Sequence, residues 1–429
     1  MTDTSSTSTG RAPLTASFRR WRWTIVALIA MSSGLLAVWN WSTRSSREPL
    51  PSVVSPREYE FAREAFELKH GRPADRLDVL FWLAEWLLGR KRPVDAAECF
   101  AAIPTSHPTY GRMARYQQGK TLLAMHRAVE AEQQLREVTS LEESSPTIKP
   151  EYLIHARQRL RHILEVELRF EERHRLLHGV IDRGEDQTFE PAAGCFPSLG
   201  RWNGPDAVLW VEHFHAINPD NLQLTIALGR YRTSQGRTKE ARQILESVVR
   251  EHPQNLSALA ALIACLREAD EPEELSRIFR MLPPRSPDDP WLLLLQRGAD
   301  AIQNGQAQEA AAAYEQLLQQ DRTCAEAWQG LGQAARLLGD IPRRKKALEM
   351  ATALGRFPNH LGKTTQESSD PNSFLDIADL CAEISLNREG AVMTRCARRL
   401  APENERVRAA VKRFRERLDE DHEAPLLGK

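Results

Sequence analysis

The sequence predicts an all-α fold in which pairs of helices stack into an extended array. Helix-favouring Ala, Leu, Glu, Arg and Gln are abundant, and apolar residues recur at the three- and four-residue spacing of one helix face. This pattern repeats about every 34 residues across residues 222–357. Such a period is typical of repeat proteins, in which each unit buries its apolar stripe only by stacking on its neighbours.

The N-terminal segment predicts a membrane anchor. Residues 1–18 are rich in Ser and Thr and are expected to form a disordered tail, and residues 19–42 are expected to form a transmembrane helix. The span itself, residues 23–41 from Trp23 to Trp41, lacks charge and extends about 28 Å as a helix. A cleaved signal peptide and a buried core helix are the alternatives.

Tryptophans at both ends of this span favour an uncleaved anchor over a signal peptide. More arginines precede the span than follow it, by a margin of one. The positive-inside rule therefore predicts a single-pass protein with a cytoplasmic N-terminus and with the repeats on the external or periplasmic side.

Composition divides the rest of the chain into two helical blocks. A polar linker at 43–57 precedes helical repeats at 58–184, which become irregular after residue 146. Three Gly and three Pro predict an inserted loop at 185–205. Repeats resume at 206–404 with an insertion at 358–370. An amphipathic capping helix at 405–420 and a tail at 421–429 follow.

The repeating positions define the expected helical hairpin. In the unit at 222–255, Gly229 has no Cβ and is expected to let the second helix approach closely, Gly236 turns the chain, and Pro253 ends the second helix. Four columns of residues recur in successive units: Gly229, Ile263, Gly298 and Gly332; Ala241, Leu275, Ala310 and Arg344; Leu245, Phe279, Tyr314 and Leu348; and Val248, Leu282, Leu317 and Ala351.

These columns resemble the tetratricopeptide repeat family. Trp328, Leu331 and Gly332 match its first-helix pattern, whereas Arg344 stands where that family has a small residue. The resemblance implies a right-handed superhelical solenoid whose first helices line a concave groove for peptides or partner helices. It places the following residues in that partner groove: Gln223, Ile226, Arg230, Thr233, Ala260, Ala264, Arg267, Leu295, Ala299, Ile302, Glu326, Gln329, Gln333 and Arg336.

The expected groove is mixed in character. Ile226 and Arg230 occupy positions where a carboxylate-clamping subfamily carries Lys and Asn, so the resemblance does not support that binding mode. Arg230, Arg267 and Arg336 are candidate anchors for anionic groups on a partner.

No pattern for a catalytic, cofactor or metal site is present. The six cysteines form no C-x-x-C pair, although Cys381 and Cys396 fall on the two helices of one expected hairpin, and their oxidation is an open alternative. His174 and His178 share a helix face, but Arg175 stands where a zinc protease needs Glu. The formal net charge is zero, so no nucleic-acid partner is expected.

We therefore expect a membrane-anchored scaffold for protein–protein interaction without intrinsic catalysis. Its protein or peptide partner is unidentified, and its membrane contact is the N-terminal helix. Three alternatives stand beside this expectation. The solenoid binds a polyanion or glycan through its arginines; the chain is a non-catalytic subunit of an envelope enzyme complex; or it is an enzyme that uses Glu185, Asp186 and Glu190 of the inserted loop.

Overall fold

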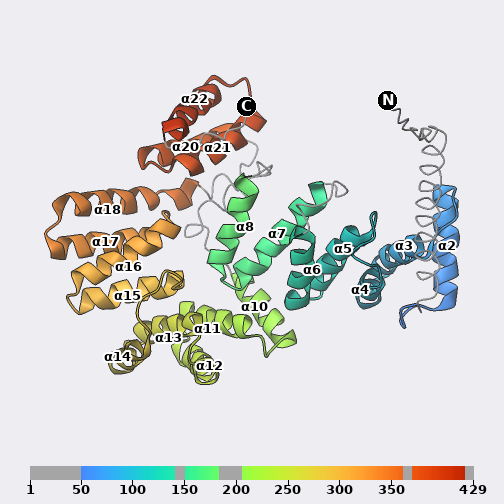
Figure 1. The fold of residues 1–429 in the computed structure, drawn as a ribbon, viewed down its shortest axis with the longest axis horizontal. Helices are drawn as coiled ribbons and strands as arrows, with labels where there is room; N and C mark the ends of the chain where they lie inside the picture. Colours follow the sequence, from blue (N-terminus) through green and yellow to red (C-terminus); the bar gives the residue numbers. More distant parts are fainter. Residues whose placement is uncertain (1–49, 141–149, 183–204, 361–369, 421–429) are drawn as a thin grey trace, which may run out of the picture. The chain divides into compact units, whose positions relative to one another are not determined.

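The computed structural model describes residues 50–140, 150–182, 205–360 and 370–420. Within these ranges every regular element is an α-helix, which confirms the all-α prediction (Figure 1). The chain divides into two compact units, one ending at Ala114 and the other beginning at Arg115. The border lies inside the predicted first block, 58–184.

The first unit is a small helical bundle. Its helices are α2 (Pro56–His70), α3 (Arg76–Gly89), α4 (Pro93–Ala101) and the start of α5 (Gly111–Ala124). Helix α3 packs on both α2 and α4 around Leu80, Leu83 and Phe100, all fully buried. Asp78 is buried in the same unit, and its carboxylate accepts two hydrogen bonds from Arg72 and one from Tyr110. These partners satisfy a charge that would otherwise be costly to bury.

The second unit opens with irregular helices. They are α6 (Ala128–Ser140), α7 (Pro150–Val166), α8 (Phe170–Asp182) and α10 (Pro205–Ile217). Helix α7 packs on α6, α8 and α10, and α10 leads into the regular array.

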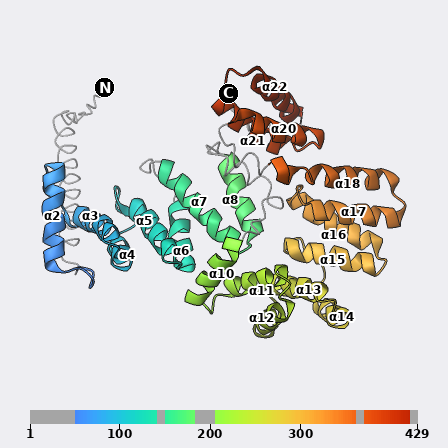
Figure 2. The ribbon, with the colours of Figure 1, turned by 180° about the vertical axis from the view of Figure 1, so that it is seen from behind.

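The regular array consists of four consecutive hairpins. They are α11 (Leu222–Ser234) with α12 (Thr238–Glu251), α13 (Leu256–Glu268) with α14 (Pro272–Met281), α15 (Trp291–Gln303) with α16 (Ala307–Gln320), and α17 (Ala325–Leu338) with α18 (Ile341–Leu354). The first helices contact one another in order, so they form one continuous layer, which Figure 2 shows from behind. A last hairpin, α20 (Pro371–Glu383) with α21 (Asn387–Leu400), carries α22 (Glu405–Glu420).

Glycines of the first column receive large side chains of the third. A Cβ at Gly229 would lie 2.6 Å from Leu245 Cδ2, and one at Gly298 would lie 2.5 Å from Tyr314 Cζ. Gly330, on the first helix of the next unit, is closer still to the same ring. Tyr314 of α16 therefore packs between two glycines, Gly298 of α15 and Gly330 of α17, and so joins one hairpin to the next.

Two of the four columns differ in the fourth hairpin. Arg344 is exposed and Leu348 is 45% exposed, although Leu348 is still the residue nearest to Gly332. Helix α18 instead buries Ala347, Met350 and Leu354, together with Ala351 of the fourth column. Burial of the Arg344 guanidinium without a partner would be costly, which accounts for its exposed position.

The predicted membrane localisation is corrected. No helix in the described ranges is long and apolar enough to cross a bilayer. The expected span at 23–41 lies outside those ranges, as do the tails at 1–18 and 421–429 and most of the inserted loop at 185–205. The cysteines that the structure describes, Cys381 and Cys396 included, are buried, and none of them forms a disulfide.

Candidate ligand-binding groove

Two neighbouring hollows lie on the layer of first helices in the second unit. The first, called here the apolar pocket, has a volume of about 470 Å³ and is lined mainly by α11, α13, α15 and α16, with Glu326 at the start of α17. The second, called here the polar pocket, has a volume of about 540 Å³ and is lined by α8, α11 and the loop before α15. Leu168, Glu171, Arg230 and Leu292 line both, so the two pockets form one groove.

The turn between α7 and α8 forms a wall of this groove. We call residues 167–172 the elbow. Its Leu168 carbonyl accepts a hydrogen bond of 2.9 Å from Arg230 Nη1, and the Phe170 ring centroid lies 5.7 Å from the Arg230 guanidinium carbon. Glu171 Oε1 accepts a 2.9 Å hydrogen bond from the backbone N–H of Trp291. The elbow is thus attached to both α11 and α15.

Buried charges hold the elbow in shape. Arg169 forms ion pairs with Glu167 at 2.7 Å, with Glu172 at 2.8 Å and with Glu132 of α6 at 2.8 Å. Burial of the Glu167 carboxyl disfavours its ionised form and raises its pKa to about 7, although Arg169 acts in the opposite direction. Leu168 has a φ of 55°, a left-handed conformation that is strained for leucine and persists because its surroundings impose it.

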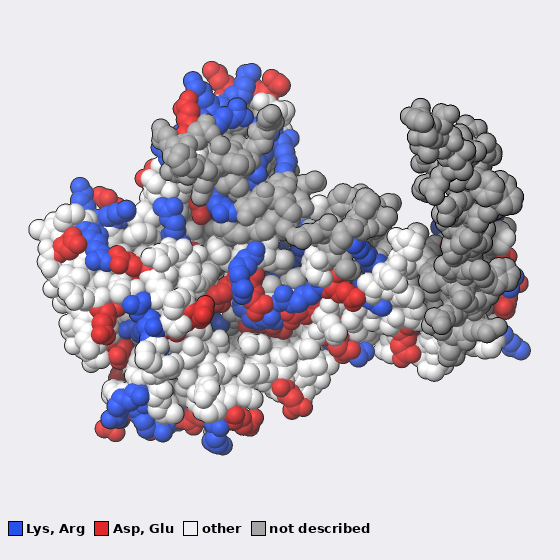
Figure 3. Space-filling view, in the orientation of Figure 1, with Lys and Arg blue, Asp and Glu red and all other residues white. Residues whose placement is uncertain are grey.

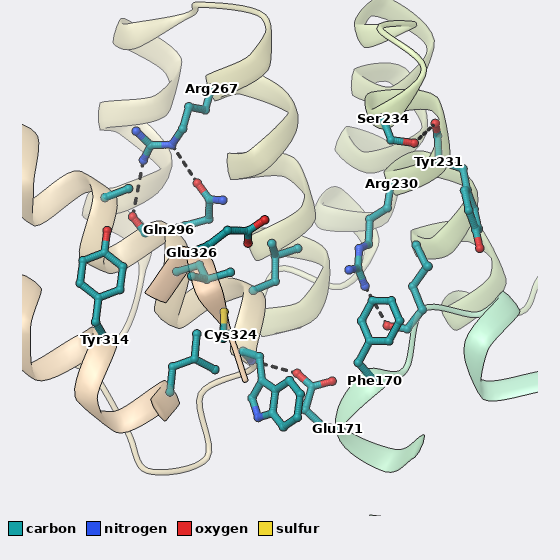
Figure 4. Close-up of a pocket in the computed structure, with 16 residues that line it drawn as sticks. Phe170, Glu171, Arg230, Tyr231, Ser234, Arg267, Gln296, Tyr314, Cys324 and Glu326 are labelled. Atoms are coloured by element: carbon teal, nitrogen blue, oxygen red, sulfur yellow. Dashed lines mark hydrogen bonds between the residues drawn. The ribbon is translucent and has the colours of Figure 1, made fainter. Parts of the chain in front are cut away.

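Arg267 is the notable cation of the apolar pocket. Its Nε donates to Gln296 Oε1 at 2.8 Å and its Nη1 to Gln303 Oε1 at 3.0 Å. No carboxylate of the described residues forms an ion pair with it, and burial lowers its pKa below the usual value. Figure 4 shows Arg267 and Tyr314 across the pocket from Arg230 and Phe170. The guanidinium therefore meets only neutral acceptors.

The structure brings part of the predicted groove set together. Arg230, Arg267, Leu295, Ala299 and Glu326 line the apolar pocket, and Gln223 and Ile226 line the polar one together with Arg230. The role of these residues in partner binding stays a prediction.

The other predicted groove residues line neither pocket. Ala260 is fully buried between helices, and the Thr233 hydroxyl donates to the Gly229 carbonyl. Ala264 is half-buried, and Ile302 packs against the hydrophobic core. Three are exposed on α17: Gln329, Gln333 and Arg336.

Sequence reasoning missed the elbow. Phe170 and Glu171 lie in a stretch with no repeat register, about 50 residues or more before the helices they contact. Helical periodicity reports which face of a segment is apolar, not which distant surface it meets. No signal in the sequence pointed to this contact.

The structure offers no metal centre within the residues it describes, because these hold no group of three or more His, Cys, Asp or Glu side chains suited to an ion. The acids suggested for catalysis, Glu185, Asp186 and Glu190, lie outside the described ranges.

Family comparison agrees with the repeat assignment. Two tetratricopeptide repeat models match the chain, one over residues 212–264 and 232–297 and the other over residues 295–343. The prediction of tetratricopeptide repeats is therefore confirmed: residues 212–343 consist of such repeats. No curated protein matches the chain.

Several solved structures resemble the chain at low identity. The tetratricopeptide repeat domain of P58(IPK) is 14% identical, with 80% of this chain and 99% of that chain covered, at a TM-score of 0.26. Human IFIT1 with m7Gppp-AAAA is 11% identical, with coverages of 88% and 91% and a TM-score of 0.33. A repeat protein from Parabacteroides merdae is 12% identical, with coverages of 71% and 98% and a TM-score of 0.28. At these TM-scores the likeness carries no argument about ligand or site.

Proposed function

We propose that this protein is a scaffold that binds a protein or peptide partner in the groove between the elbow and helices α11, α13 and α15. The observation that carries the proposal is the apolar pocket on the first-helix layer, where half-exposed Leu292, Leu295 and Ala299 lie beside Arg267. Concave sites with an apolar lining and a few polar groups are typical of ligand binding, and repeat arrays use this surface for extended segments.

The charge distribution favours a protein partner over a polyanion. Lys and Arg are interspersed with Asp and Glu on the face shown in Figure 3. Within the groove, Arg230 already donates a hydrogen bond to the Leu168 carbonyl and lies against the Phe170 ring. Glu171 and Glu326 add negative charge. A polyanion binds where several positively charged side chains lie close together.

Display of short random peptides against the full chain tests the proposal. We expect the display to enrich peptides that bind Ala299→Trp at least tenfold more weakly than wild type. The indole would fill the apolar pocket without altering charge. Gln308→Trp, on an exposed position of the second helix α16, is the matched control and should leave binding unchanged.

The thermal unfolding midpoint of Ala299→Trp is measured first, and Ala299→Leu replaces it if the larger residue destabilises the fold. A set of enriched peptides that bind wild type and the pocket variant equally would rule out this groove as the binding surface, as would the absence of any enrichment.

A further inference from the structure

We infer that the groove selects a partner segment in which a large apolar side chain lies next to a carboxylate, with Arg267 as the anchor for that carboxylate. The inference rests on the proposed function and names the ligand chemistry of the same site.

The apolar part of the ligand follows from the pocket lining. Leu292, Leu295 and Ala299 of α15 present half-buried aliphatic groups, and Phe170 of the elbow closes the opposite side. The volume of about 470 Å³ lies within the range of small-ligand pockets, so it accommodates a large apolar side chain with part of its backbone. Burial of such a side chain yields about 1.5–3 kcal/mol before the costs of association.

The carboxylate of the ligand follows from the surroundings of the Arg267 guanidinium. Its guanidinium is half-buried and donates to the side-chain carbonyl oxygens of Gln296 and Gln303, and at 3.5 Å to the backbone carbonyl of Gln296. Asp300 lies near enough to act on Arg267 electrostatically, but its carboxylate accepts from Asn304 Nδ2 at 3.0 Å and forms no ion pair with Arg267. A desolvated cation with neutral partners gains most from a carboxylate, because charge-assisted hydrogen bonds are roughly twice as strong as neutral ones.

The acids in the lining do not supply that carboxylate. Glu171 Oε1 accepts the Trp291 backbone N–H across the groove, and Glu326 is exposed and forms no ion pair with Arg267. The positive charge of Arg267 is therefore left for a ligand.

The elbow gives an independent argument, because it already places an aromatic–acidic pair in the groove. The Phe170 ring lies against the Arg230 guanidinium, and the adjacent Glu171 carboxylate binds the N-terminus of α15. Arg230 and Arg267 occupy neighbouring first helices, α11 and α13, and both line the apolar pocket. We expect the partner to present a large apolar side chain and an adjacent carboxylate to Arg267, as the elbow presents Phe170 to Arg230 and Glu171 to α15.

The test is a double-mutant cycle between the full chain and synthetic peptides taken from the display experiment. Each acidic residue of a pocket-dependent peptide is replaced by its amide, Glu by Gln or Asp by Asn, and dissociation constants are measured by fluorescence polarisation. We expect one such replacement to weaken binding to wild type at least tenfold and to weaken binding to Arg267→Gln less than twofold. Arg267→Lys should retain part of the preference for the acid, because it keeps the charge.

The outcomes separate this inference from the proposed function. Peptides that lose binding in Ala299→Trp but show no acid preference, or show the same preference in Arg267→Gln, overturn the inference and leave the groove as the binding surface. Absence of any peptide sensitive to Ala299→Trp overturns both. If Arg267→Gln does not fold, the comparison of wild type with Arg267→Lys decides: a smaller loss on amidation in Arg267→Lys than in wild type supports Arg267 as the anchor, and an equal loss or no loss in both overturns it.

Discussion

Replacement of Tyr314 by alanine is expected to lower the free energy of unfolding of the second unit by about 3–5 kcal/mol, the usual cost of truncating a buried aromatic residue. The ring is 5% exposed and fills the space left by Gly298 on α15 and Gly330 on α17. Its loss would leave a cavity at the junction of two hairpins. Urea denaturation followed by circular dichroism measures the change.

The glycines provide the complementary test. Gly330→Ala would drive a Cβ into the Tyr314 ring and is expected to cost about 1–3 kcal/mol. Gly355→Ala is the matched control, because the nearest atoms to its Cβ lie at ordinary contact distances of 3.4 and 3.5 Å and its φ is −61°. In the Tyr314→Ala background the Gly330→Ala penalty should largely disappear, since the clashing ring is absent. Additive penalties would contradict the packing of the Tyr314 ring against Gly330.

Glu167→Gln is expected to change how stability depends on pH. The folded-state pKa of Glu167 is raised from 4.5 to about 7, mainly by burial of its carboxyl, so the folded state holds the proton more tightly than the unfolded state. Stability from this group is therefore complete below pH 4.5 and is lost as pH rises through about 7, a change on the order of 3 kcal/mol. The glutamine variant has no proton to lose and should not show this decline.

The measurement compares wild type with Glu167→Gln between pH 4.5 and 8 in urea. The comparison must be between variants, because His174 acts with the opposite sign: burial, followed by Arg173 and Arg388, lowers its pKa to about 4, so it destabilises the fold as pH falls below 6.5. Glu251→Gln, on an exposed position of α12, controls for the loss of one carboxylate. Equal pH slopes for wild type and Glu167→Gln would contradict the assignment.

The sequence by itself determined the helical hairpins and, over residues 212–343, their match to tetratricopeptide repeats. Their period and their boundaries arise from local chemistry: apolar residues at helical spacing, turn glycines such as Gly236 with a φ of 72°, and helix caps such as Asn221, whose side chain accepts from the Leu224 N–H. The sequence also predicted that Gly229 admits its partner helix closely. The structure adds that Leu245 packs on Gly229 and Tyr314 on Gly298.

Part of the groove could be foreseen in the same way. The resemblance to tetratricopeptide repeats placed Arg230, Arg267, Leu295 and Ala299 on one surface of the first helices, and the structure gathers them in one pocket. Register does not report how closely neighbouring helices approach. Ala260 is consequently buried between helices rather than exposed in the groove.

Only the tertiary structure decided what meets the groove and which charges remain for a ligand. The elbow contacts α11 and α15 across 62 and 120 residues of sequence, through the Arg230–Leu168 and Trp291–Glu171 hydrogen bonds. These contacts assign Arg230 to the elbow and leave Arg267 with neutral acceptors, although the two arginines looked alike in the sequence. The physical reason is that periodicity indicates which face of a helix is buried. The pairing of individual charges instead depends on which distant segments lie next to each other in the fold.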